Sequence, residues 1–151
     1  ENFKGRMHVG SGTVLTERQV EMTKNAGGEF IISPDTFDMV IVLTKKLGML
    51  SMPGAFSPTE IMTAVRLGAD YVKVFPVANL GASYIKAIRA PLKGVKLLGV
   101  GGINLENILD FIKAGVCGFG LGANIIDKEM LNNDDYAGIR ELAKKYTEMV
   151  K

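Results

Sequence analysis

The stretch Ala69-Asp70-Tyr71-Val72-Lys73-Val74-Phe75-Pro76 has the character of a short buried strand, because apolar and β-branched residues flank one lysine and a proline ends the run. Burying an unpaired ammonium group is costly, so burial favours the neutral amine and lowers the pKa of a lysine. A neutral amine is a nucleophile that can form a Schiff base with a ketone. The alternative is that Lys73 extends to the end of the strand and keeps its charge in water. The segments around this stretch help to decide whether Lys73 is a buried nucleophile or a charged residue in water.

Strand-like and helix-like segments alternate on both sides of it. The apolar runs are short and continuous, which is typical of parallel strands buried on both faces. Helix start and stop signals follow most of these runs. The predicted strands are 8–14, 30–34, 49–54, 69–76, 95–100 and 117–121, and the predicted helices are 17–25, 37–47, 58–67, 83–90, 105–114, one starting at 122 and one from about 134. The sequence therefore predicts an α/β fold in a single domain, residues 1–151, without a linker.

Several of the helix starts carry cap residues. Thr16 is the predicted N-cap of the first helix. Ser57 is the predicted N-cap of the third, with a proline in its first position and a capping-box glutamate. Either Asp35 or Thr36 is expected to cap the second helix, and Asn104 the helix that begins at 105.

Two architectures fit this alternation. An open, doubly wound sheet would be complete at this length. An eight-unit (β/α) barrel usually needs about 250 residues, and six strand–helix units are too few to close it. If the fold is a TIM barrel, we expect six of its eight units here.

Composition narrows the classes of function. The net charge is only +2 and the 18 Lys and Arg form no long run, which argues against nucleic-acid binding. No apolar run approaches the roughly 20 residues that span a bilayer, so no membrane partner is expected. One cysteine excludes an internal disulfide and fits the cytoplasm. One histidine and one cysteine exclude a His/Cys metal site.

Candidate functional residues stand at or near the predicted carboxyl ends of the strands, where parallel α/β proteins place their sites. Gly101, Gly102 and Gly122 follow two consecutive strands. Glycine lets backbone N–H groups approach an anion, and a helix starting at Gly122 would add a partial positive charge. These glycines predict a phosphate site, or alternatively only tight corners.

Five motifs, and their order along the chain, resemble those of the 2-keto-3-deoxy-6-phosphogluconate aldolases and the related 6-phosphogalactonate and 4-hydroxy-2-oxoglutarate aldolases. They are Val9-Gly10-Ser11-Gly12-Thr13-Val14-Leu15, Ile32-Ser33-Pro34, Met52-Pro53-Gly54, Val72-Lys73-Val74-Phe75-Pro76 and Val100-Gly101-Gly102-Ile103. The resemblance covers nearly the whole chain. It implies a class I aldolase on a (β/α)8 barrel, a homotrimer that takes a small keto-acid substrate and needs neither a metal nor an organic cofactor.

The resemblance also implies roles for individual residues. Lys73 matches the Schiff-base lysine, which attacks the C2 ketone so that an aldehyde leaves and a pyruvate enamine remains. Phe75 would pack beside the imine, and Thr13 and Pro53 would line the pyruvate end. The phosphate loops would be formed by Gly101, Gly102, Gly122 and Ala123.

Three departures from the family pattern affect these expectations. The chain starts where the family's third strand starts, so the glutamate and arginine carried by the first two units have no counterpart, and an incomplete barrel with little turnover is expected. Ala123 stands where many members have a phosphate-binding serine. Val100 stands where gluconate-type members often have threonine, so the sugar stereochemistry stays open. The alternatives are another phosphate-binding barrel enzyme, such as an epimerase or a thiamine-phosphate synthase, and a non-catalytic barrel fragment.

Overall fold

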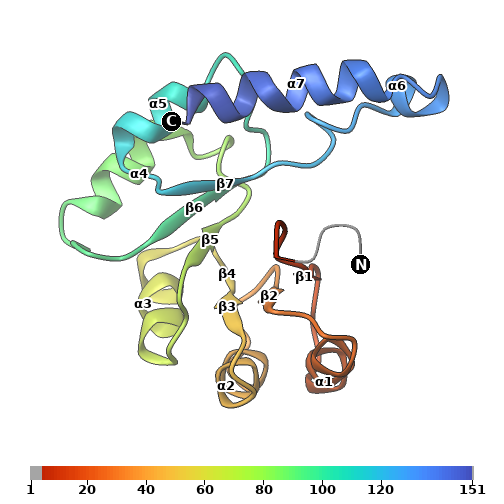
Figure 1. The fold of residues 1–151 in the computed structure, drawn as a ribbon. Coiled ribbons are helices and arrows are strands. Elements are labelled where there is room, and N and C mark those ends of the chain that lie inside the picture. The colour runs from red at the N-terminus through yellow and green to blue at the C-terminus, as the bar shows by residue number, and fades with distance from the viewer. Residues whose placement is uncertain (1–4, 151) are drawn as a thin grey trace. The chain divides into compact units, whose positions relative to one another are not determined.

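The computed structural model describes residues 5–150, and the chain divides into two compact units, one extending to Phe75 and the other starting at Pro76. The elements of the first unit are β1 (Gly10–Ser11), α1 (Glu17–Asn25), β2 (Phe30–Ile32), α2 (Asp38–Lys46), β3 (Leu50–Met52), β4 (Gly54–Ala55), α3 (Pro58–Arg66) and β5 (Val72–Val74). Those of the second are α4 (Gly81–Arg89), β6 (Leu97–Val100), α5 (Ile108–Ala114), β7 (Gly118–Gly120), α6 (Lys128–Asn132) and α7 (Tyr136–Met149). Figure 1 shows α1, α2 and α3 on one side of the strands of the first unit.

Every strand pairing within the two units is parallel. In the first unit β1, β2 and β3 form a sheet in that order, and β4 pairs with β5. In the second unit β6 pairs with β7. Each pair of parallel strands needs a crossover, and a helix supplies it between consecutive strands such as β1 and β2. The predicted α/β fold with parallel strands is therefore confirmed.

Each unit has its own apolar core. In the first unit, side chains from the loop after β1, from α1, β2 and α2, and from the residue before β3 form one buried cluster: Val14, Val20, Ile31, Val40 and Met49. In the second unit the fully buried side chains include Ile85, Leu97, Ile103 and Ile108. Burial of each such side chain stabilises the fold by about 1.5–3 kcal/mol.

The predicted N-caps Thr16 and Ser57 and the predicted capping box at Ser57 are present, and Thr16 also forms a capping box. The Thr16 hydroxyl accepts a hydrogen bond from the Gln19 N–H at 3.3 Å, and the Gln19 side chain accepts one from the Thr16 N–H at 3.2 Å. The Ser57 hydroxyl accepts from the Glu60 N–H at 3.3 Å, while Oε2 of Glu60 accepts from the Ser57 N–H at 2.7 Å. These reciprocal bonds satisfy N–H groups that the first helical turn leaves free.

Two of the other cap expectations are wrong. Helix α2 begins at Asp38 with Phe37 in the cap position, because the Thr36 hydroxyl donates instead to the Gly54 carbonyl at 2.6 Å. Helix α5 begins at Ile108 rather than at 105. Here Oδ1 of Asn104 accepts from the Glu106 and Asn107 N–H groups, both at 3.0 Å, and so stabilises a turn in place of a helical start.

The predicted strand 49–54 is divided into β3 and β4 at Pro53. Proline has no N–H to donate to a strand ladder, so it interrupts the pairing. Its carbonyl group remains available and accepts a hydrogen bond from the Lys73 N–H at 2.8 Å. This bond joins the break in the strand to the centre of β5.

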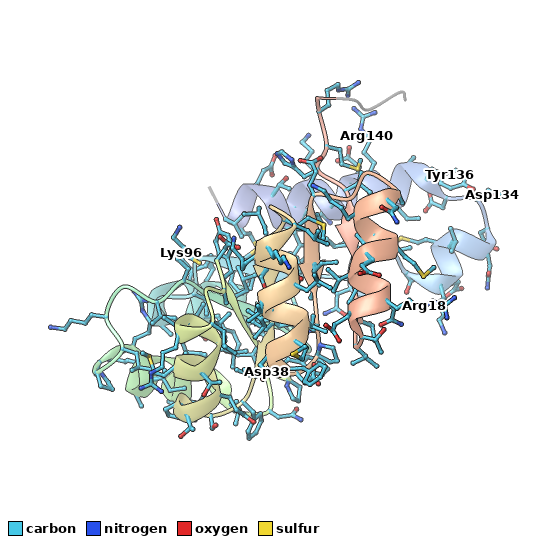
Figure 2. All side chains as sticks on the ribbon, turned by 90° about the horizontal axis from the view of Figure 1, so that it is seen from below. Arg18, Asp38, Lys96, Asp134, Tyr136 and Arg140 are labelled. Atoms are coloured by element: carbon cyan, nitrogen blue, oxygen red, sulfur yellow. The ribbon has the colours of Figure 1, made fainter. Side chains whose placement is uncertain are left out.

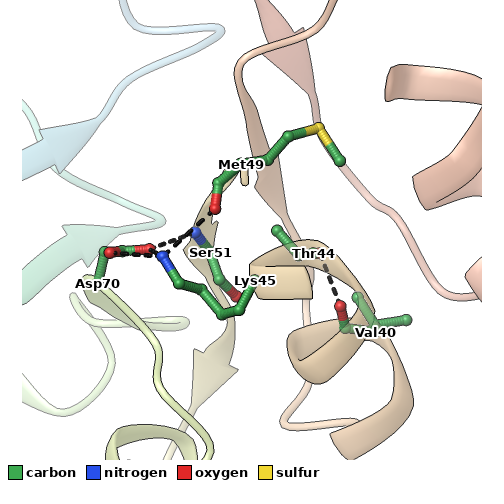
Figure 3. Close-up of polar contacts among 6 residues, drawn as sticks. All are labelled: Val40, Thr44, Lys45, Met49, Ser51 and Asp70. Atoms are coloured by element: carbon green, nitrogen blue, oxygen red, sulfur yellow. Dashed lines mark hydrogen bonds and ion pairs between the residues drawn. The ribbon is translucent and has the colours of Figure 1, made fainter. Parts of the chain in front are cut away.

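Asp70 anchors the start of β5 to β3. Its carboxylate accepts hydrogen bonds from the Lys45 ammonium at 2.7 and 2.8 Å and from the Ser51 N–H at 2.8 Å (Figure 3). The Asp70 N–H in turn donates to the Ser51 carbonyl at 3.0 Å. Because both partners of the ion pair are partly buried, this pair is screened less than a surface pair.

Replacing Asp70 by alanine should lower the free energy of unfolding by about 1–3 kcal/mol, because the Ser51 N–H and the Lys45 ammonium lose their acceptor. Urea unfolding of the two proteins measures this difference. Asp70→Asn is the matched control, since it keeps an acceptor oxygen for Ser51 and removes only the charge. An alanine variant as stable as the native chain would contradict the anchoring role.

The outer faces of α1 and α2 carry charged side chains together with exposed apolar ones, such as Met22 and Val42. Figure 2 shows Arg18 on α1 and Asp38 on α2, and both side chains are exposed. In the described residues, no helix is both long enough and apolar enough to cross a membrane.

Candidate functional site

Lys73 lies in the middle of β5, between two fully buried valines, Val72 and Val74, and its own side chain is half-buried. Its Nζ lies 4.5 Å from the centre of the Phe75 ring. Burial lowers the pKa of Lys73 from the ordinary lysine value of 10.5. The amine is therefore more easily deprotonated than a surface lysine, which is the property that a Schiff-base nucleophile requires.

Three of the sequence-predicted site residues come together in the first unit. The Pro53 carbonyl accepts the Lys73 N–H, and the Phe75 ring lies beside the Lys73 amine. Pro53 is buried, whereas Phe75 is 40% exposed. One side of the amine thus faces an apolar ring that solvent also reaches.

Gly54 lies opposite the lysine and is closely packed against another backbone segment. It is the residue of β4 in register with Lys73. A Cβ at Gly54 would lie 2.2 Å from the carbonyl oxygen of Pro34, so the backbone of Pro34 occupies the space of a side chain. The close approach requires glycine.

Thr13 lies in the loop that follows β1 in the first unit. It has a φ of +57°, which is unusual for a β-branched residue, and it is exposed. It lines a separate open pocket of about 340 Å³ with Gly12, Gln19 and Met22. Within residues 5–150, no hydrogen bond or ion pair joins Thr13 to Lys73.

The four residues predicted to bind phosphate line one pocket of about 270 Å³ in the second unit: Gly101, Gly102, Gly122 and Ala123. The first two have φ values of +88° and +77°, which favour glycine. The Gly102 carbonyl accepts a hydrogen bond from the Asn107 side chain at 2.9 Å. The Asn124 side chain, from the second loop, donates to the Ile103 carbonyl in the first. The two loops are therefore joined directly.

The expectation that a helix starts at Gly122 is wrong. Its carbonyl accepts hydrogen bonds from the Ile125 and Ile126 N–H groups at 2.9 and 3.0 Å, which closes a turn. Helix α6 begins later, at Lys128, because the Asp127 carboxylate caps it through the Glu129 and Met130 N–H groups. The pocket therefore lacks the helix N-terminus proposed from the sequence.

Backbone donors remain in the pocket. Among the described residues, none accepts a hydrogen bond from the backbone N–H of Gly102, Gly122 or Ala123. N–H groups of this kind, in a turn, can bind an anion.

The described residues contain no group of three or more His, Cys, Asp and Glu side chains that could hold a metal ion.

Sequence reasoning missed Phe56, which directly follows β4 and is 47% exposed. Its N–H donates to Oε2 of Glu60 at 2.8 Å, so its backbone belongs to the start of α3 and no longer to the strand.

Comparison with known proteins gives a consistent result. Residues 2–142 match the family model described as KDPG and KHG aldolase. A probable 2-dehydro-3-deoxy-6-phosphogalactonate aldolase from Rhizobium meliloti (strain 1021) is 42% identical over 127 residues, which are 83% of this chain and 60% of that protein. The chain thus spans about three fifths of the length of this relative.

Two solved structures are similar over almost the whole chain. One, described as a native KDPGal structure, has a TM-score of 0.88 and 32% identity, and the match covers 99% of this chain and 73% of that one. The other is a KDPG aldolase from Legionella pneumophila with pyruvate captured as a covalent carbinolamine intermediate. Its TM-score is 0.84 and its identity 31%, over 93% of this chain and 69% of that one.

Proposed function

Since the chain belongs to the KDPG and KHG aldolase family, we propose that it acts as a class I aldolase whose nucleophile is Lys73. The observation that carries the proposal is the half-buried lysine of β5, with its pKa lowered by burial and its amine beside the Phe75 ring. The Legionella relative, with pyruvate held covalently, supports the same chemistry.

In the proposed reaction, neutral Nζ of Lys73 attacks C2 of a 2-keto acid, and the carbonyl oxygen leaves as water. The resulting protonated imine withdraws electrons, so the C3–C4 bond breaks and the C4 hydroxyl becomes an aldehyde as it loses its proton. The enamine that remains takes a proton at C3. Water then releases pyruvate and restores the amine. Phe75 keeps water away from one side of the imine, and Pro53 holds β5 through its carbonyl group.

We propose a 2-keto-3-deoxy-6-phospho sugar acid as the substrate, cleaved to pyruvate and an aldehyde such as glyceraldehyde 3-phosphate. The pocket of Gly101, Gly102, Gly122 and Ala123, with its free N–H groups, supports a phosphate group in the substrate. The Rhizobium relative is named as a phosphogalactonate aldolase, which favours the galactonate stereochemistry for the substrate. The alternative substrate, 4-hydroxy-2-oxoglutarate, carries no phosphate group. Thr13 is proposed to act at the pyruvate end.

We further propose that the fold is a (β/α)8 barrel of which this chain contributes six units in one domain, that the protein is a homotrimer, and that it works in the cytoplasm. The similarity to the KDPGal structure supports the barrel. Light scattering of the purified protein tests the trimer.

Reduction with sodium cyanoborohydride in the presence of pyruvate, followed by peptide mass mapping, tests the function. The expected result is a pyruvate-derived adduct that forms faster on Lys73 than on surface lysines such as Lys24 or Lys113. Circular dichroism of the same sample establishes that the chain is folded. A folded chain without an adduct would refute the Schiff-base function and favour another phosphate-binding barrel enzyme.

The rate of trapping should rise with pH and reach half its maximum below pH 10.5, because burial lowers the pKa of Lys73. The lowered pKa also makes the free energy of unfolding depend on pH. Below the pKa of Lys73 in the folded chain, the buried charge lowers the free energy of unfolding, and this loss disappears as the pH rises to the pKa of Lys73 in the unfolded chain. Trapping rates measured across this range, with the adducts on surface lysines as the reference, provide the check. A midpoint at or above 10.5 would contradict the desolvation of Lys73.

Replacing Ala123 by serine should strengthen the binding of inorganic phosphate about 2- to 10-fold, because the new hydroxyl adds one hydrogen bond worth about 0.5–1.5 kcal/mol. Isothermal titration calorimetry measures the affinity. Ala137→Ser, an exposed position in α7, is the matched control and should leave binding unchanged. Equal affinities in the native and A123S chains would argue against phosphate in this pocket.

A further inference from the structure

Two successive carbonyl groups of the loop after β6 are held by hydrogen-bond donors from other segments. The Gly101 carbonyl accepts from the Ala78 N–H at 3.1 Å, and the Gly102 carbonyl accepts from Nδ2 of Asn107 at 2.9 Å. Both glycines have a positive φ and belong to the pocket of about 270 Å³ in the second unit. This pocket, here called the glycine pocket, is lined among others by Gly101, Gly102, Ile103, Gly122 and Ala123.

The N–H groups of the same two peptide planes point the opposite way. A peptide bond is planar and trans, so a carbonyl and the N–H of the next residue lie on opposite sides of it. Because the two carbonyls are turned toward Ala78 and Asn107, the N–H groups of Gly102 and Ile103 point away from those residues. Among residues 5–150, none accepts a hydrogen bond from either N–H group. Successive N–H groups of this kind can bind an anion.

The two partners of the Asn107 amide determine its orientation. Its Oδ1 accepts from the Asn104 N–H at 2.9 Å, while its Nδ2 donates to the Gly102 carbonyl at 2.9 Å. A backbone N–H can only donate and a carbonyl can only accept, so the amide fits in one orientation. The Asn107 N–H in turn donates to Oδ1 of Asn104 at 3.0 Å. These reciprocal bonds hold the Asn107 side chain in place directly before α5.

Ile103 is fixed on both sides of its free N–H group. Its side chain is fully buried, and its carbonyl accepts a hydrogen bond from the Asn124 side chain. The peptide that carries the Ile103 N–H is held through the Gly102 carbonyl, which Asn107 binds. The Asn107 side chain therefore sets the direction in which this N–H group points.

We propose that Asn107 is a positioning residue of the glycine pocket, which turns the Gly102 carbonyl away from the pocket and directs the Ile103 N–H at the phosphate group of the substrate. The inference rests on the phosphate site of the proposed function and adds a donor to it. Asn107 acts through the loop and not by contact with the phosphate. Without its amide, the glycine at 102 lets the peptide rotate and bring a carbonyl oxygen toward the anion.

Replacing Asn107 by alanine in the full chain should weaken the binding of inorganic phosphate about tenfold, because one hydrogen bond to a charged group is lost. Isothermal titration calorimetry measures the affinity, and circular dichroism establishes that each variant is folded. Asn132→Ala, at an exposed position in α6, is the matched control and should leave the affinity unchanged.

Asn107→Asp is a second variant of nearly the same size. Its carboxylate keeps an acceptor for the Asn104 N–H and removes only the donor to the Gly102 carbonyl, so it should weaken phosphate binding at least as much as Asn107→Ala. Leu109→Asp adds the same charge at an exposed position of α5 and is the control for electrostatic repulsion. It should weaken binding less than Asn107→Asp does.

Amide NMR spectra of isotope-labelled protein separate positioning from a merely structural role. With phosphate at a saturating concentration, the N–H signals of Gly102, Ile103 and Ala123 should shift in the native chain. In the N107A chain at its own saturating concentration, the shift of the Ile103 signal should be lost and that of Ala123 should remain. A side chain that only stabilised the start of α5 would leave the Ile103 shift intact at saturation.

The outcomes separate the role of Asn107 from the phosphate site itself. Native phosphate affinity in the N107A or N107D chain would overturn the role of Asn107 and leave the glycine pocket standing as a phosphate site. A full Ile103 shift in the saturated N107A chain would overturn it as well. A folded native chain in which phosphate shifts none of the pocket signals would refute the phosphate site and the inference with it. The pyruvate adduct on Lys73 would still test the Schiff-base function independently.

Discussion

Replacing Lys73 by arginine should reduce the rate of pyruvate trapping by about 10³-fold or more, because loss of a covalent nucleophile removes most of the rate enhancement that depends on it. Arginine keeps the positive charge and the long stem, but its guanidinium group stays protonated and forms no imine. The measurement is the amount of reduced adduct on the peptide that contains position 73. The same variant should lose aldol cleavage wherever the native protein shows it.

Lys24→Arg is the matched control, since it makes the same exchange on the exposed face of α1 and should leave trapping unchanged. Thermal unfolding of all three proteins establishes that the site variant is folded. An adduct that forms in the K73R chain at the native rate would show that another lysine is the nucleophile and would move the site away from β5.

The parts of the fold that follow from neighbouring residues could be predicted from the sequence. The capping boxes at Thr16 and Ser57 depend on side chains three residues apart, so the chain itself brings the partners together. The lysine strand is likewise evident from the apolar residues on either side of Lys73. Local patterns of this kind place the helices and strands to within a few residues.

The errors arose where a side chain had more than one possible partner. Asn104 stabilises a turn instead of a helix start, and Thr36 donates to a carbonyl 18 residues away. The glycines line one pocket, but local sequence does not distinguish the turn that Gly122 closes from a helix start. In each case the alternative conformations are close in free energy, and tertiary contacts decide between them.

The relations that define the lysine site depend on strand register, which the sequence does not give. That Gly54 is opposite Lys73, and Ala55 opposite Val74, follows only from the pairing of β4 with β5. A shift of one residue would turn Lys73 toward the valine side of the strand. The pocket that contains Thr13 could not be foreseen for the same reason.

Replacing Gly54 by alanine should lower the free energy of unfolding by about 3 kcal/mol, because the added Cβ overlaps backbone atoms that cannot rotate away. The Cβ would lie 2.2 and 2.3 Å from the oxygen and carbon of the Pro34 carbonyl and 2.9 Å from the Asp35 nitrogen. The overlap can be relieved only if β4 moves. That movement strains the hydrogen bonds from the Gly54 N–H to the Asp35 carbonyl at 3.1 Å and from Thr36 to the Gly54 carbonyl. Urea unfolding measures the loss.

Gly12→Ala provides the matched control for stability, since a Cβ at Gly12 meets no atom within 4 Å and its φ is not positive. It should change the free energy of unfolding by less than about 0.5 kcal/mol. Because Gly54 is in register with Lys73, the G54A chain should also trap pyruvate more slowly under conditions in which it is still folded. A folded G54A chain with native stability and native trapping would mean that the backbone of Pro34 can move freely, and that the close packing opposite Lys73 plays no part in positioning the amine.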